Sequence, residues 1–291
     1  MKLVSFSDDA GTRIGVAVEA GIVDLSVAAP ALPRDMKSLL QAGESAMDEA
    51  RRAGQSGAPV LALDSVTLRA PVLNPGKILA IGLNYGDHIE ETGMDRPEHQ
   101  IWFNKQHNCI NDPFGDINLP AVSTALDYEA ELCFVIGKRC KHVPRDRAHE
   151  VIAGFMAGND VSVRDWQFRS PTMQIGKSFD THGPTGPWLV TPDEVGDPHD
   201  LAIKCLVNGE ERQSSNTKHL IFDCFDQIAH LTQSFTLDPG DIIFTGTPAG
   251  VGIGDKPPSF LVEGDVVRIE IDHIGVIENR VVKEDARTII A

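Results

Sequence analysis

The segment from Asp127 to Ile136 limits most strongly what this chain can fold into. Its acidic residues alternate with uncharged ones and run into a short apolar stretch, which is typical of a strand entering a core. Because a strand places residues i and i+2 on one face, Glu129 and Glu131 project the same way. Two such carboxylates repel each other unless positive charge lies between them, and an oxygen-bound divalent cation supplies it. Asp160, farther along the chain, can complete the site from a second strand.

The donor types narrow the choice of metal. Glu129, Glu131 and Asp160 are all oxygen donors, with no Cys or His among them, which favours Mg²⁺ or Mn²⁺ over Zn²⁺ and allows Ca²⁺ in crystals. The same pattern also fits a solvated strand face whose acids pair with Lys and Arg. Spacing alone leaves both interpretations open.

Composition excludes several classes of partner. The 291 residues are 42% hydrophobic, which is enough for a substantial core, and 42 acidic against 26 basic residues give a formal charge of -16. Such a charge argues against nucleic-acid binding and against an anionic membrane surface. The cysteines are odd in number and lack CxxC spacing, and the chain shows neither a signal peptide nor a membrane-spanning stretch. We therefore expect reduced thiols in a cytoplasmic protein.

The first 70 residues look like a small module with its own strands and a helix. A stretch with two prolines and a glycine at 69–76 is the best boundary, which predicts domains at 1–70 and 71–291. The expected elements of the small domain are strands at 2–6, 13–18 and 22–25 and a helix at 35–53.

In the larger domain, short strands dominate after a strand expected at 77–82. Helices are expected at 84–91 and 222–234. Residues 94–125 show little periodicity, so we expect a functional loop or lid there that closes over ligand.

Four further groups have residue types suited to chemistry. On a helix His88 and Glu91 are i, i+3 neighbours that can take a proton from water, or form an ordinary surface salt bridge. Arg164 can bind a substrate carboxylate or pair with Asp165 or Glu131. Lys177 can hold an enolate or carboxylate oxygen or lie on the surface. The glycine-rich loop 245–252 lacks the Gly-Lys-Ser/Thr of a phosphate loop, so its N–H groups and the Thr247 hydroxyl are better suited to a carboxylate.

Taken together and in this order, these motifs closely resemble the fumarylacetoacetate hydrolase family, over about residues 70 to 285. The first 70 residues resemble the accessory domain of its longer bacterial members. The segments that carry the resemblance are Gly82-Leu83-Asn84-Tyr85 with His88 and Glu91, Asp127 to Leu132, Asn159 to Gln167, Gly176 to Thr181, and Thr245 to Gly252.

The resemblance implies a fold that is mainly β with some α, a mixed β-sandwich roll with a small N-terminal α/β domain, assembled as a homodimer. It assigns metal binding to Glu129, Glu131 and Asp160. The position of a fourth acidic ligand is apolar here, around Ile81, so water or substrate would complete the shell. It assigns the water-activating pair to His88 and Glu91, a role at the substrate oxygens to Lys177, and substrate binding to Tyr85, Arg164, Gln167, Thr181 and Thr247.

The resemblance also implies a small anionic 2-oxo or 2,4-dioxo acid as substrate. The His88–Glu91 pair favours hydrolysis of a C–C bond in an acylpyruvate, in the catabolism of aromatic or sugar acids. Oxaloacetate decarboxylation, hydroxymuconate isomerisation and oxo-enoate hydration use related metal–enolate chemistry and stay open. A catalytically silent binding protein is the remaining alternative.

Overall fold

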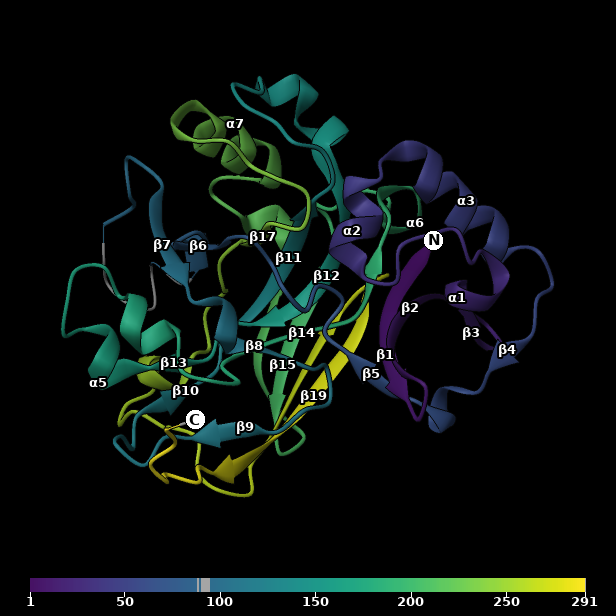
Figure 1. Cartoon of the computed structure of the whole chain (residues 1–291). Coiled ribbons are helices and arrows are strands. Elements are labelled where there is room, and N and C mark those ends of the chain that lie inside the picture. Colours follow the sequence, from purple (N-terminus) through teal and green to yellow (C-terminus); the bar gives the residue numbers. More distant parts are fainter. Residues whose placement is uncertain (88, 90–94, 291) are drawn as a thin grey trace.

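The computed structural model describes residues 1–87, 89 and 95–290. Strands predominate over helices, and two sheets face each other at the centre of the molecule (Figure 1). This confirms the predicted fold class, mainly β with some α.

The larger sheet runs from the N-terminal segment across to the region of the site. Its strand order is β4-β3-β2-β1-β14-β12-β11-β17-β6-β7, with β5 paired to β1 and β8 paired to β14. Because β1 pairs directly with β14, the N-terminal segment and the rest of the chain share one sheet, while the division at residue 70 stays a prediction. The strands are β1 (Lys2–Asp8), β2 (Gly11–Val18), β3 (Gly21–Asp24), β4 (Val60–Leu61), β5 (Thr67–Arg69), β6 (Ile78–Gly82), β7 (Ile101–Lys105), β8 (Ile110–Asn111), β11 (Ala130–Ile136), β12 (Ile152–Asn159), β14 (Gly183–Val190) and β17 (Ile242–Phe244).

A five-stranded sheet packs against β11, β12 and β14 and buries one apolar core between the two sheets. The N-terminal helices bury a second apolar core on the other side of the large sheet. The β11 and β12 strands are therefore buried along their whole length, which explains their nearly continuous apolar sequence. The smaller sheets contain β16 (Glu210–Asn216), β15 (Ala202–Val207), β18 (Val266–Ile271), β19 (Gly275–Lys283) and β9 (Ile117–Leu119), and the pair β10 (Leu126–Asp127) and β13 (Ser162–Val163).

Helices cover the sheet edges and one face. The predicted helix at 222–234 is confirmed as α7 (Cys224–Ser234), whose first turn is capped because the Asp223 carboxylate accepts from the N–H groups of Phe225 and Asp226. The other helices are α1 (Leu25–Ala28), α2 (Met36–Gln41), α3 (Glu44–Gly54), α5 (Arg164–Gln167) and α6 (Pro192–Val195), and the 3₁₀ turns are Leu63–Ser65, His107–Cys109, Arg145–Val151, Gln174–Lys177, Thr217–His219 and Gly252–Gly254.

Two expectations about local structure were wrong. The single helix expected at 35–53 is two helices, because Gly43 adopts a φ of +81° between them, a conformation that few other residues accept. The stretch 94–125 is not one irregular lid, since β7, β8 and β9 lie within it and β7 pairs with β6. The helix expected at 84–91 lies partly outside the described residues.

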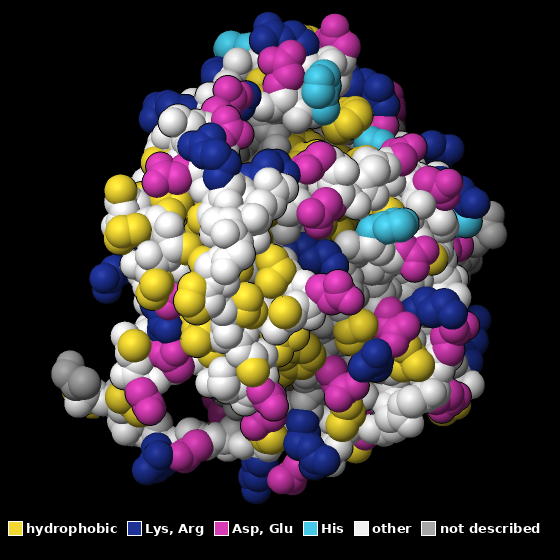
Figure 2. All heavy atoms as spheres, turned by 90° about the vertical axis from the view of Figure 1, so that its right-hand side faces the viewer, with side chains coloured by type: hydrophobic (Ala, Val, Ile, Leu, Met, Phe, Trp, Pro, Cys, Tyr) yellow, Lys and Arg dark blue, Asp and Glu magenta, His cyan; other side chains and the backbone are white. Residues whose placement is uncertain are grey.

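Acidic and basic side chains are interspersed around apolar ones on the face that carries the N-terminal segment (Figure 2). None of the described helices is long and apolar enough to cross a membrane.

Candidate metal centre and substrate cavity

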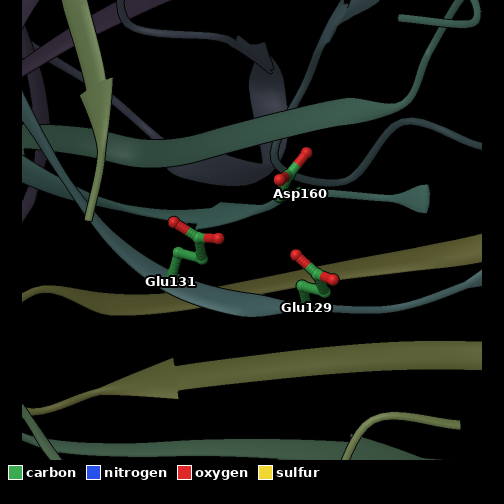
Figure 3. Close-up of side chains that lie close together, drawn as sticks. All are labelled: Glu129, Glu131 and Asp160. Carbon is green, nitrogen blue, oxygen red and sulfur yellow. The ribbon is translucent and has the colours of Figure 1, made fainter. Parts of the chain in front are cut away.

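The three carboxylates singled out in the sequence meet where β11 and β12 lie side by side (Figure 3). The strands are antiparallel, with Ala130 opposite Asn159 and Glu131 opposite Gly158. The Asp160 N–H donates to the Glu129 carbonyl at 2.9 Å, which fixes the side chain of Asp160 beside the acidic pair. Each of the three residues offers a carboxylate oxygen within 4.8 Å of the others, and all three are buried. The strand face is therefore buried and not solvated, although the pairing with Lys and Arg that this alternative expected is observed for Glu129 and Asp160.

Positive side chains bind two of these carboxylates. Lys177 Nζ donates to Glu129 Oε2 at 2.7 Å and to Asp160 Oδ2 at 2.8 Å. Lys105 Nζ donates to Asp160 Oδ1 at 2.6 Å, and Arg164 donates from a guanidinium nitrogen to Glu129 Oε1 at 2.6 Å. Lys177 is thus buried among the acids, and the interpretation as a surface lysine is wrong.

Glu131 is different from the other two. Its Oε2 accepts from the Gly246 N–H at 2.6 Å, and among the described residues it makes no ion pair with Lys, Arg or His. Burial, followed by repulsion from Asp160 and Glu129, raises the pKa of Glu131 well above its usual value. A divalent cation within the trio would stabilise the ionised form of Glu131, so the residues fit a metal site.

Arg164 pairs with carboxylates other than those expected. Its Nε and one terminal nitrogen each lie 2.8 Å from Asp127 Oδ2, and its other contacts are Glu129 and Gln167, whose Oε1 accepts at 2.9 Å. Pairing with Asp165 or Glu131 is not observed. Arg164 therefore joins the carboxylate network from α5 and also lines the cavity described below.

Asp127 was quoted in the sequence motif but given no role. Its Oδ1 accepts from the N–H groups of Tyr128 at 2.9 Å and Gly252 at 2.8 Å, and its Oδ2 accepts from the Ile253 N–H at 3.0 Å. A Cβ at Gly252 would lie 2.1 Å from the Ser259 carbonyl oxygen, so only glycine fits this approach. Asp127 thus ties the strand of the acids to the loop that ends the glycine-rich motif.

An N–H group of the loop around Thr247 meets a carboxylate, as expected, because Gly246 donates to Glu131, whereas the Thr247 hydroxyl contacts an amide instead. Thr247 Oγ1 accepts from Gln213 Nε2 at 2.8 Å, and Gln213 also receives the Ala130 N–H at 2.9 Å. Gln213, which the sequence analysis did not identify, therefore links the loop to β11. No sequence motif indicates Gln213, because it lies far from the loop and from β11 in the sequence.

Lys105 is the most important site residue that the sequence did not reveal. In the sequence it belongs to the stretch 94–125, for which only a lid was expected. Its Nζ donates to the backbone carbonyls of Lys177 and His182 as well as to Asp160, so all three of its donors are used. Lys105 comes from β7 and fixes both a proposed ligand and the turn that carries Lys177.

A cavity of about 240 Å³ opens beside this network. Its polar lining contains Arg164, Gln167, Lys177 and Thr247 together with Glu129. Its apolar lining is formed by Ile81, Leu83, Ile101, Phe103, Phe168, Met173 and Ile253.

Four other predicted site residues are not placed at this cavity. Tyr85 is fully buried without lining the cavity, and burial, followed by the charge of Glu131, raises its pKa well above the usual value. The Thr181 hydroxyl accepts from the Asn118 N–H at 2.8 Å, and Thr181 does not line the cavity either. Substrate binding by these two residues stays a prediction. His88 and Glu91 lie outside the described residues.

Comparison with known proteins decides the family. Residues 77–282 match the fumarylacetoacetate (FAA) hydrolase C-terminal family. The chain belongs to the fumarylacetoacetate hydrolase family. An oxaloacetate tautomerase of Xenopus laevis, described as mitochondrial, is 45% identical over 288 residues, which are 97% of this chain and 90% of the relative.

Solved structures of family members have the same fold. A fumarylacetoacetate hydrolase from Exiguobacterium antarcticum is 36% identical, with a TM-score of 0.87 over 98% of this chain and 100% of that one. Maleylpyruvate hydrolase from Sphingobium sp. SYK-6, solved with manganese(II) ion and pyruvate, is 33% identical, with a TM-score of 0.82 over 98% of this chain and 100% of that one. The resemblance inferred from the motifs is confirmed, and these relatives are enzymes that act on small organic acids.

Proposed function

We propose that this protein is a divalent-cation-dependent hydrolase that cleaves a C–C bond in an acylpyruvate or related 2,4-dioxo acid. The observation that carries the proposal is the buried trio of oxygen donors in which Glu131 has no cationic partner among the described residues, beside two lysines and an arginine. Such a site combines metal ligands with fixed positive charge, as enolate chemistry requires.

Glu129, Glu131 and Asp160 would hold the cation, for which we propose Mg²⁺ with Mn²⁺ as a substitute, because all donors are hard oxygens. When bound, the cation would supply Lewis-acid polarisation of a substrate carbonyl. Lys177 is held at Glu129 and Asp160 and also lines the cavity, so its ammonium faces the place where negative charge would develop.

The charges favour an anionic substrate. With all four ionised, the carboxylates of Asp127, Glu129, Glu131 and Asp160 would exceed the three cationic side chains by one negative charge. A divalent cation reverses the sign to one positive charge, and a 2-oxo carboxylate would then enter a site of opposite charge within a negatively charged protein.

For the hydrolytic step we propose His88 as general base, oriented by Glu91. His88 would remove a proton from water, and the hydroxide would add to the acyl carbonyl carbon. Cleavage of the bond between that carbon and C3 of the pyruvate unit leaves its electron pair on C3 as an enolate. Protonation of the enolate gives pyruvate, and the acyl group leaves as a carboxylic acid.

Oxaloacetate tautomerisation is a second candidate, favoured by the 45% identity to an oxaloacetate tautomerase. It moves a proton between C3 and the C2 oxygen and needs no attacking water. Lys177 and the same oxygen donors would serve both reactions, so only products separate them.

Purified protein with Mg²⁺ should be tested on acylpyruvates, oxaloacetate, 2,4-dioxo sugar acids and hydroxymuconates. The proposal expects one carboxylic acid and one pyruvate for each acylpyruvate consumed, with no turnover after EDTA treatment. Loss of the oxaloacetate enol without release of pyruvate or CO₂, and no cleavage of acylpyruvates, would favour the second candidate instead.

We further propose a homodimer in the cytoplasm. The thiols of Cys109, Cys133, Cys140, Cys205 and Cys224 are all buried and free, which suits a reducing compartment. Light scattering after size-exclusion chromatography tests the dimer, which predicts twice the 31.5 kDa chain mass.

A further inference from the structure

The cavity has two chemically different parts. Its polar floor carries the only cationic side chains among the described lining residues, Arg164 and Lys177. Both are already paired, Arg164 with Asp127 and Glu129 and Lys177 with Glu129 and Asp160. The N–H groups of these two side chains can bind the oxygens of a 2-oxo acid head. No other cationic side chain among the described lining residues is left to pair with a second carboxylate.

The wall is apolar from the buried end to the rim. Ile81 and Phe103 are buried, whereas Ile101 is 37% exposed and Phe168 is 68% exposed at the surface. Exposed large apolar side chains from two elements that line one cavity indicate a surface that meets an apolar ligand. Residues 88, 90–94 and 291, which the structure does not describe, comprise one histidine, two glutamates and no Lys or Arg in the sequence.

We infer that this cavity selects substrates whose part distal to the 2-oxo acid head is an uncharged apolar chain or ring. This rests on the proposed function for the head and adds the class of the tail. A second carboxylate at the distal end would lose hydration against Ile101, Phe103 and Met173 without gaining an ion pair.

The size of the cavity sets a scale for the tail. A volume of about 240 Å³ equals that of roughly eight water molecules, which accommodates a 2-oxo acid head and a short chain. Each methylene that leaves water for the wall should tighten binding about fourfold. Compact dicarboxylates such as oxaloacetate use only the floor.

The test uses two ligands that differ only at the distal end and cannot be cleaved as acylpyruvates. In 2-oxoadipate the terminal methyl of 2-oxohexanoate is replaced by a carboxylate. Calorimetry at saturating Mg²⁺ should show 2-oxohexanoate binding at least about tenfold more tightly.

Two variants place a cation on the wall. Ile101→Lys lies on β7, an edge strand that tolerates lysine, and Phe168→Lys changes a largely exposed side chain. Each should shift the ratio toward 2-oxoadipate by about twofold to fivefold, because ion pairs at partly exposed positions are weakened by solvent. The matched control Val122→Lys, at 58% exposure outside the cavity, should leave the ratio unchanged.

The outcomes separate this inference from the proposed function. Equal or tighter binding of 2-oxoadipate by the unmodified protein, or an unchanged ratio in both wall variants, overturns the tail preference alone. A preference for 2-oxohexanoate in a protein that cleaves no acylpyruvate supports the tail preference while the proposed hydrolysis fails. If neither ligand binds, the 2-oxo acid head is wrong and both fail together.

Discussion

The floor, taken here as the polar lining of the cavity together with the adjoining buried residues Lys105, Glu131 and Asp160, consists of charged side chains that are mostly paired with one another. The wall of the cavity is built from apolar side chains that are partly exposed. A change in the floor leaves a buried charge without its partner, so its cost is large and extends to folding. A change in the wall alters mainly which ligand is preferred. Stability and chemistry should therefore depend on the floor, whereas substrate specificity should depend on the wall.

The largest expected effect is on the rate of acylpyruvate cleavage, and it comes from the proposed base His88, which belongs to neither the floor nor the wall. If His88 activates water, His88→Ala should lower acylpyruvate cleavage about 10²–10⁴-fold at saturating Mg²⁺, because general base catalysis typically contributes that much. Metal affinity should survive, since His88 is not a proposed ligand. Any oxaloacetate activity should fall much less, because that reaction needs no attacking water. Cleavage of acylpyruvates at a near-normal rate would remove His88 from the mechanism.

The floor should depend on Lys105 for folding. Lys105→Met removes one of the two cationic partners of the fully buried Asp160 carboxylate, the other being Lys177, and should lower the free energy of unfolding by about 3 kcal/mol. The control Lys138→Met breaks an exposed pair with Glu44, which solvent screens, and should change the free energy of unfolding far less. Urea unfolding followed by circular dichroism measures both. Equal effects of the two substitutions would contradict the buried network.

A smaller effect is expected next to the floor, at His182, whose backbone carbonyl accepts from Lys105. Burial, together with the nearby Lys105, lowers the pKa of His182 to about 3 from 6.5. As the pH falls, the His182 ring is protonated in the unfolded state before it is protonated in the folded state. His182 should therefore lower the free energy of unfolding progressively from pH 6.5 toward pH 3, and should have no such effect above pH 6.5. His182→Gln should flatten this acid limb in urea unfolding at several pH values. An unchanged slope would mean that His182 does not titrate as described.

The three carboxylates of the floor could be predicted from the sequence because their pattern is local to two strands. The two-residue period of a strand placed Glu129 and Glu131 on one side, and antiparallel pairing of β11 with β12 brought Asp160 to them. The partners of these acids could not be predicted the same way. Lys105 lies 55 residues from Asp160 in sequence, and only the pairing of β7 with β6 brings it to the site.

Other misses have equally physical causes. Low periodicity at 94–125 suggested a lid because short strands leave too few residues to show an alternation. The pairing of Arg164 with Asp127 depends on the short sheet of β10 and β13, which sequence spacing does not reveal. The apolar wall draws residues from five separate segments, so no single motif indicates it.

The central claim is that the carboxylate trio binds a divalent cation, and titration of the protein with Mn²⁺, followed by electron paramagnetic resonance, tests it most directly. The unmodified protein should bind one Mn²⁺ per chain, competed by Mg²⁺, and Glu131→Gln should weaken binding more than about 100-fold while the protein stays folded. The control Glu263→Gln lies at an exposed position outside the site and should bind normally. No stoichiometric binding by the unmodified protein, or normal binding by Glu131→Gln, would contradict the account.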